Sequence, residues 1–114
     1  MAYVYKIAAL ADWDAALRAG RFEGAAIDLR DGYIHLSTAA QAQQTARLHF
    51  AGQAGLVLLK IDAAGLGSAL KWEASRGGDL FPHLYGPLEC APVEAVTPIE
   101  LDADGTPQLG NLDA

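Results

Sequence analysis

The sequence has little of what marks secreted, membrane-bound or disulfide-rich proteins. It contains one cysteine, Cys90, so no disulfide can form within the chain. No apolar run approaches the roughly 18 residues that a membrane-spanning helix needs, and the first residues lack the basic start and long apolar stretch of a signal peptide. We therefore expect a cytoplasmic protein with no membrane partner.

Positive charge is also scarce. Lysine and arginine together number 8 against 14 aspartates and glutamates, which gives a formal net charge of −6. Binding to nucleic acids depends on lysine and arginine side chains that neutralise phosphates, so a nucleic-acid partner is disfavoured. We expect a small-molecule ligand instead.

The motifs of common phosphate and metal sites are absent as well. The chain has no Walker or Rossmann glycine pattern and no H-x-x-x-H or C-x-x-C spacing. A metal site would have to combine distant residues such as His35, His83, Glu73 and Asp79. No spacing supports that set, and we predict no metal. Cys90 has no activating base beside it and is expected to pack as a small side chain.

The length and composition are those of one small domain. The 114 residues are 52% hydrophobic, which is enough for a single core. We expect one domain over residues 1–114, with its core from about residue 3 to 101 and a C-terminal tail at 102–114.

The N-terminal part predicts a strand and then a helix. Residues 2–8 are aromatic and β-branched, which favours a strand. Asp12 is expected to cap a helix that ends at Gly20. The side chains predicted on its buried face are Trp13, Ala16 and Leu17.

A second strand follows a turn signal at Asp31 and Gly32. Its alternating pattern sends Ile34 and Leu36 to one face, because successive side chains of a strand point to opposite sides. The opposite, polar face receives Tyr33, His35 and Ser37.

Three further strands complete the pattern. The apolar run at 56–61 predicts a central strand covered on both faces, and Trp72–Glu73 predicts a short one. Residues 93–101 predict a late strand, at an edge because of Pro98. This order of elements indicates an α+β fold: a mixed or split β-sheet with two main helices.

His35 is the first candidate site residue, because it lies just before a predicted helix. Thr38 and Gln41 have capping-box spacing, which predicts a helix over residues 39–50. The amides and dipole of that helix can bind an anion, with hydroxyls from Ser37 and Thr38 beside it. The alternative is a buried histidine that only satisfies a nearby carbonyl. The residues alone leave both open.

A second group of candidates follows later in the chain. If residues 81–88 are extended, His83 and Tyr85 project to the same side and can flank a ligand. The alternative is a rigid, proline-containing loop that packs its aromatic rings. Glu73 can act as a base or hold a ribose hydroxyl, or else be a plain surface glutamate.

Together these motifs resemble a known family. The segments concerned are Asp31–Ser37, Gln41, Leu58–Asp62, Trp72–Glu73 and Phe81–Leu88. They are similar to the mostly bacterial family called domain of unknown function 952, and the resemblance runs from about Val4 to Leu101. The family name implies no established activity.

That family in turn resembles, more distantly, the ADP-ribosyltransferase-like fold, and Ile34–Ser37 looks like the corresponding part of RNA 2′-phosphotransferases. The resemblance implies NAD or another ADP-ribosyl compound as ligand, with glycosyl (ADP-ribosyl) transfer or other NAD processing as the activity. It implies catalytic roles for His35, Glu73 and His83. The residues implied in binding the ligand are Lys6, Ser37, Thr38 and Tyr85.

The sequence also departs from that pattern. Transferases of this fold usually carry histidine or arginine on the first strand, where Lys6 stands here. The arginine set of RNA 2′-phosphotransferases is not recognisable, so activity on RNA phosphate is not expected. A shared fold does not fix function, and the alternative prediction is a noncatalytic module that binds a small molecule or anion.

Overall fold

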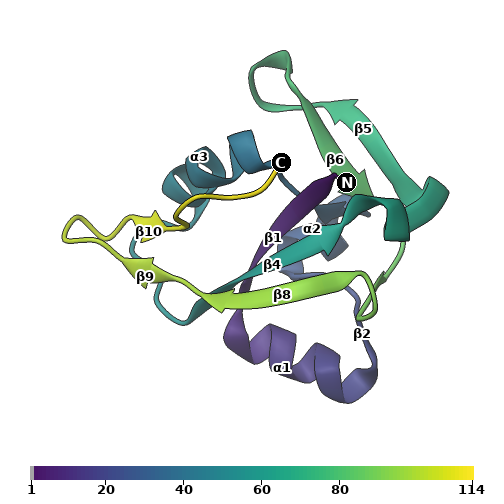
Figure 1. Cartoon of the computed structure of the whole chain (residues 1–114), viewed down its shortest axis with the longest axis horizontal. Helices are drawn as coiled ribbons and strands as arrows, with labels where there is room; N and C mark the ends of the chain where they lie inside the picture. Colours follow the sequence, from purple (N-terminus) through teal and green to yellow (C-terminus); the bar gives the residue numbers. More distant parts are fainter. Residues whose placement is uncertain (1) are drawn as a thin grey trace.

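The computed structural model describes residues 2–114, apart from the side chain of Arg76. Figure 1 shows how the elements of this part of the chain are arranged. The helices are α1 (Leu10–Ala19), α2 (Ala26–Asp31) and α3 (Ala39–His49), with 3-10 segments at Ala63–Ala69 and Arg76–Gly78. The strands are β1 (Tyr3–Ala9), β2 (Arg21–Phe22), β3 (Ile34–His35), β4 (Leu56–Asp62), β5 (Leu70–Ala74), β6 (Leu80–Leu84), β7 (Leu88–Glu89), β8 (Val93–Pro98), β9 (Glu100–Leu101) and β10 (Pro107–Gln108). None of the helices described is long and apolar enough to cross a membrane.

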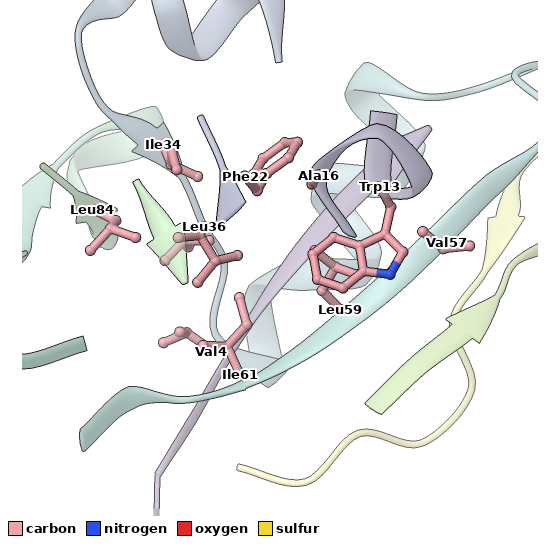
Figure 2. Close-up of a cluster of buried hydrophobic side chains, with 11 residues drawn as sticks. Val4, Trp13, Ala16, Phe22, Ile34, Leu36, Val57, Leu59, Ile61 and Leu84 are labelled. Atoms are coloured by element: carbon pink, nitrogen blue, oxygen red, sulfur yellow. The ribbon is translucent and has the colours of Figure 1, made fainter. Parts of the chain in front are cut away.

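An antiparallel sheet in the order β1-β4-β8 forms the centre of the fold. β4 lies in the middle because its leucine, valine and isoleucine side chains can be buried on both faces. On one face, Trp13 and Ala16 of α1 join the core cluster drawn in Figure 2. On the other face, Ala42 and Ala46 of α3 complete a second cluster. The predicted central strand is therefore confirmed.

A second sheet, in the order β3-β6-β5, meets the first at one point. Tyr5 of β1 and Ser37, just after β3, exchange both backbone hydrogen bonds, with N···O distances of 2.7 and 2.9 Å. Among residues 2–114, no further bridge joins β1 to β3. The α+β class with a split sheet is confirmed, and the split leaves one edge of β1 without a partner strand beyond Tyr5.

α1 begins earlier than the sequence indicates. Its N-cap is Ala9, and Asp12, predicted as the cap, lies in the first turn instead, where its carboxylate still favours the positive end of the helix dipole. Gly20 ends the helix as predicted, with a φ of 91° that suits glycine. The prediction that Leu17 is buried is wrong: it is 53% exposed. Each residue turns roughly 100° around a helix, so burying Ala16 rotates its neighbour outward.

α2 is an element that the sequence does not predict. The sequence predicts a turn at Asp31 and Gly32, but these residues end this helix. Gly32 is its C-cap, at a φ of 87°. Six residues make less than two turns, which is too short for a helical period to be visible. α1 and α3 are the two main helices predicted, and α2 is a third.

The later strands and the tail follow the sequence more closely. Trp72–Glu73 lies in β5, and the strand predicted over 93–101 is divided into β8, at a sheet edge, and β9. The predicted tail is not free of structure, since β10 pairs with β9. Leu109 and Leu112 also pack against the second core cluster, so the tail covers part of the core.

Leu59→Ala tests the central position of β4. Leu59 is fully buried in the cluster of Figure 2, and truncating it leaves a cavity that should lower the free energy of unfolding by about 2–5 kcal/mol. The matched control is Leu17→Ala on the exposed side of α1, which should change it by about 0.5 kcal/mol or less. Urea unfolding measures both, and equal losses would contradict the assignment of the core.

Candidate functional site

A cavity of about 550 Å³ lies where β1 and β3 diverge. This volume is within the range of about 300–1,000 Å³ that small-molecule sites occupy. β1 contributes Tyr5, Lys6 and Ile7, and the chain around β3 contributes His35 and Ser37. The remaining lining residues are Ile27 of α2, Leu36, Thr45 and His49 of α3, Phe50 at the C-cap of α3, Ser75, and Phe81 and His83 of β6.

The two histidine motifs meet in this cavity. His35 and His83 are directly opposite each other in the β3–β6 pairing, so their side chains share one face of the sheet. Their ring centroids are 5.8 Å apart. Tyr33 stacks on the ring of His83 at 4.1 Å and lies 4.6 Å from that of His35. The predicted alternation is confirmed, because Ile34 and Leu36, which alternate with Tyr33, His35 and Ser37 along the chain, are buried in the core.

One buried carboxylate holds His35. Asp28 of α2 is 2% exposed, and its Oδ1 accepts from both Nδ1 and the backbone N–H of His35, at 2.6 and 3.0 Å. Its Oδ2 accepts from the backbone N–H of Ala25 at 2.8 Å and lies 2.9 Å from Nζ of Lys6. Burial alone would raise the pKa of Asp28, but the hydrogen bond from His35 and the charge of Lys6 outweigh it and hold that pKa well below its usual range.

Lys6 is committed to this carboxylate. It is 5% exposed, and its Nζ lies 2.9 and 3.1 Å from the two oxygens of Asp28. Burial lowers the pKa of Lys6, and the charge of Asp28 opposes that effect. The family resemblance implies that Lys6 binds the ligand. Lys6 does line the cavity, but its ammonium group lies against Asp28, so its charge acts on a ligand through Asp28 and His35.

A second carboxylate holds His83. Oε1 of Glu73 lies 2.8 Å from Nδ1 of His83 and accepts a hydrogen bond from the hydroxyl of Tyr85, also at 2.8 Å. The bonds from His83 and Tyr85 lower the pKa of Glu73, and the same contact raises the pKa of Tyr85. His83 and Tyr85 thus project to one side of the extended segment, as predicted. Neither Glu73 nor Tyr85 belongs to the cavity lining, and both reach it through His83.

A third carboxylate covers the other ring nitrogen of His35. Oδ2 of Asp31 lies 2.9 Å from Nε2 of His35. Asp31 is exposed and also accepts from Nε of Arg30 at 2.8 Å, and that hydrogen bond lowers the pKa of Asp31. The ring of His35 therefore lies between a buried carboxylate and an exposed one, and it does not merely satisfy a backbone carbonyl.

Ser37 and Thr38 have different surroundings. The hydroxyl of Ser37 is buried 3.0 Å from that of Thr45, and both residues line the cavity. Thr38 accepts from the backbone N–H of Gln41, whose side chain accepts from the N–H of Thr38. This confirms the predicted capping box. Thr38 is outside the lining, and its hydroxyl serves the start of α3.

The free edge of β1 also faces the cavity. Backbone groups of successive residues in a strand point to opposite edges. Since Tyr5 bonds to Ser37, the N–H and C=O of Ile7 point in the same direction, away from β4. Ile7 lines the cavity, and no described strand pairs with it on that side. Its backbone thus presents one donor and one acceptor at the cavity edge.

Asp28 is the site residue that sequence reasoning missed. A signal for it existed, because Lys6 interrupts an apolar strand and a buried lysine needs a buried counter-charge. Asp28 is an acid between Ile27 and Leu29, seven residues before His35. Within the residues that the structure describes, no group of His, Cys, Asp and Glu side chains is arranged to hold a metal ion.

Comparison with known proteins gives a family and a fold. A family model described as protein of unknown function DUF952 matches residues 7–96. The crystal structure of protein CC0527 from Caulobacter crescentus is 59% identical, with a TM-score of 0.93 over 95% of each chain. The solution structure of CC0527 gives a TM-score of 0.86 at 59% identity, over 96% of this chain and 95% of that one. No curated protein matches the chain.

The low pKa of Asp28 predicts a loss of stability in acid. A carboxyl group whose pKa is lower in the folded than in the unfolded chain stabilises the fold above the unfolded pKa of about 4, and that contribution is lost as the pH falls. Each pH unit below about 4 then removes up to about 1.4 kcal/mol through this group.

The measurement compares the natural chain with the Lys6→Met/Asp28→Asn variant, which lacks both charges. Between about pH 6 and about pH 3, the free energy of unfolding of the natural chain should fall by about 1 kcal/mol more than that of the variant. Urea unfolding at the two pH values gives both numbers. Identical acid losses would show that Asp28 is not held in its ionised form by the fold.

Proposed function

Since the chain belongs to the DUF952 family, whose description assigns no activity, we propose its function from the site: it binds NAD or another ADP-ribosyl compound in the cavity between the two sheets. The observation that carries this proposal is that His35 and His83 share one cavity and are each tied at Nδ1 to a carboxylate. Paired histidines of this kind can bind a ligand and move a proton within it.

The free edge of β1 supports the nicotinamide part of the proposal. A primary carboxamide is planar and carries one acceptor and one donor side by side. The C=O and N–H of Ile7 can bond to such a group as a neighbouring strand would. His35 and His83 also line the cavity, where a flat aromatic ligand can contact their rings.

The hydroxyls of Ser37 and Thr45 support the ribose part. Both residues line the cavity on the α3 side. Thr45 donates to the backbone carbonyl of Gln41 at 3.1 Å and lies 3.0 Å from the hydroxyl of Ser37, so the hydroxyl oxygen of Ser37 can accept a hydrogen bond from a ribose hydroxyl. Apolar side chains such as Phe50 and Phe81 form much of the remaining wall. A few polar groups in a largely apolar cavity are typical of nucleotide and other small-molecule sites.

The geometry also supplies a group for ADP-ribosyl transfer. In that reaction the bond from the ribose C1′ to the nicotinamide nitrogen breaks, and its electron pair stays on nicotinamide. The oxygen of an acceptor hydroxyl or of water bonds to C1′ and must lose its proton. Nδ1 of His83 faces the ionised Glu73 and so carries a hydrogen, which leaves Nε2 to take that proton.

The second candidate is a noncatalytic binding module. It is favoured by the 2.9 Å contact between Nε2 of His35 and Asp31, because the Nε2–H of a doubly protonated ring, which donates to this carboxylate, can donate to an anionic ligand group instead. This function needs no proton transfer by His83. Release of nicotinamide from NAD would reject it.

Isothermal titration with NAD, ADP-ribose and nicotinamide tests the proposal. We expect at least one of the three to bind the natural chain. His35→Ala should weaken that binding at least about 10-fold, since it removes a hydrogen-bonding group worth about 1.4 kcal/mol or more. The control is Arg18→Ala on the exposed side of α1, which should bind as the natural chain does. No heat with any of the three from a folded sample would end the nucleotide proposal.

A further inference from the structure

We propose that Asp28 is the positioning residue of this site: it fixes a hydrogen on Nδ1 of His35 and so leaves Nε2 as the atom that meets the ligand. The inference rests on the proposed use of His35 in ligand binding. It assigns a role to a residue that does not line the cavity itself.

The first support is the two-point attachment of His35. One oxygen of Asp28 accepts from both the ring and the backbone N–H of this residue, at 2.6 and 3.0 Å. Because the ring and the backbone of His35 bond to the same oxygen, the two bonds fix the side-chain torsions of His35 and also hold β3 at this residue. The ring therefore has one orientation, with Nδ1 toward Asp28 inside α2 and Nε2 toward Asp31 at the exposed end of that helix.

The second support is that the carboxylate is held in its ionised form. Lys6 lies against both oxygens, and the backbone N–H of Ala25 donates to Oδ2. An ionised carboxylate only accepts hydrogen bonds, so the ring nitrogen that faces Asp28 at 2.6 Å must carry the hydrogen. A neutral ring carries one hydrogen, and Asp31 faces Nε2 from an exposed position at 2.9 Å. The shorter, buried contact with Asp28 therefore selects the tautomer with the hydrogen on Nδ1.

The third support is the way α2 is packed. Asp28 is the buried residue of this helix, whereas Ile27 and Leu29 beside it are 47% and 66% exposed. A six-residue helix with its apolar side chains outward has little hydrophobic anchoring. Its contacts through Asp28 with β1 and β3 place the carboxylate where it serves His35.

Asp31 also contacts the ring of His35, but it does not position that ring as Asp28 does. Asp31 is exposed, contacts only the ring of His35 and is also held by Arg30. A ligand can therefore take its place at Nε2. Asp28 is 2% exposed and cannot be replaced in this way.

The test reads the hydrogen positions on the ring directly. Two-dimensional nuclear magnetic resonance of the ¹⁵N-labelled chain at about pH 9, above the usual histidine range, shows which ring nitrogen carries hydrogen. In the natural chain, Nδ1 of His35 should give a protonated signal and Nε2 an unprotonated one. In Lys6→Met/Asp28→Asn the amide can donate as well as accept, so the Nδ1-protonated form should become a mixture with the other tautomer.

Two controls come from the same spectra. Asp31→Asn removes only the exposed carboxylate and should leave the Nδ1-protonated form of His35 unchanged. His83, which faces Glu73, should keep its own Nδ1-protonated form in every one of these variants.

An Nε2-protonated ring in the natural chain would overturn the inference, and so would an unchanged tautomer in a folded double variant. If the double variant does not fold, the spectrum of the natural chain and that of Asp31→Asn still decide. Because no ligand is added, the result is independent of whether NAD binds, so a failure here and a failure of the proposed function are distinguishable.

Discussion

The arrangement around the cavity depends on the buried ion pair between Lys6 and Asp28. It joins β1 to α2, and through His35 it joins both to β3. Replacing a buried ion pair by apolar residues is often neutral or even stabilising, so net stability does not account for it. Its consequence is geometric: it fixes a short helix and one histidine ring against an edge of β1 that no strand within residues 2–114 covers there.

The cavity itself results from how the two sheets are joined. Tyr5 and Ser37 form a single bridge, after which β1 and β3 separate. The antiparallel register of β3 and β6 then sets His35 opposite His83. A shift of this register by one residue would turn one histidine into the core and destroy the pair. The site is therefore a property of strand pairing between segments almost 50 positions apart, with loops contributing little.

The sequence predicts elements whose signals are local and misses those set by tertiary contacts. The capping box at Thr38 and the apolar run of β4 are complete within a few residues, and both are confirmed. α2 is too short to show a period, and Leu17 is exposed because the sheet selects which side of α1 is buried. The face of His35 could be predicted from alternation. Its pairing with Asp28 could not, because the same carboxylate also binds Lys6 of β1, and these three residues meet only in the folded chain.

The two histidines have unlike surroundings, which divides their roles under the proposed function. His83 is 4% exposed, faces a single carboxylate and is covered on one side by Tyr33. Among the described residues nothing bonds to its Nε2, so that atom is available to take a proton. His35 is more open, and its Nε2 contacts the displaceable Asp31. A ligand group that replaces Asp31 can donate a hydrogen bond to Nε2 of the neutral ring, while Asp31 keeps Arg30 and loses little. Binding is thus assigned to His35 and proton transfer to His83.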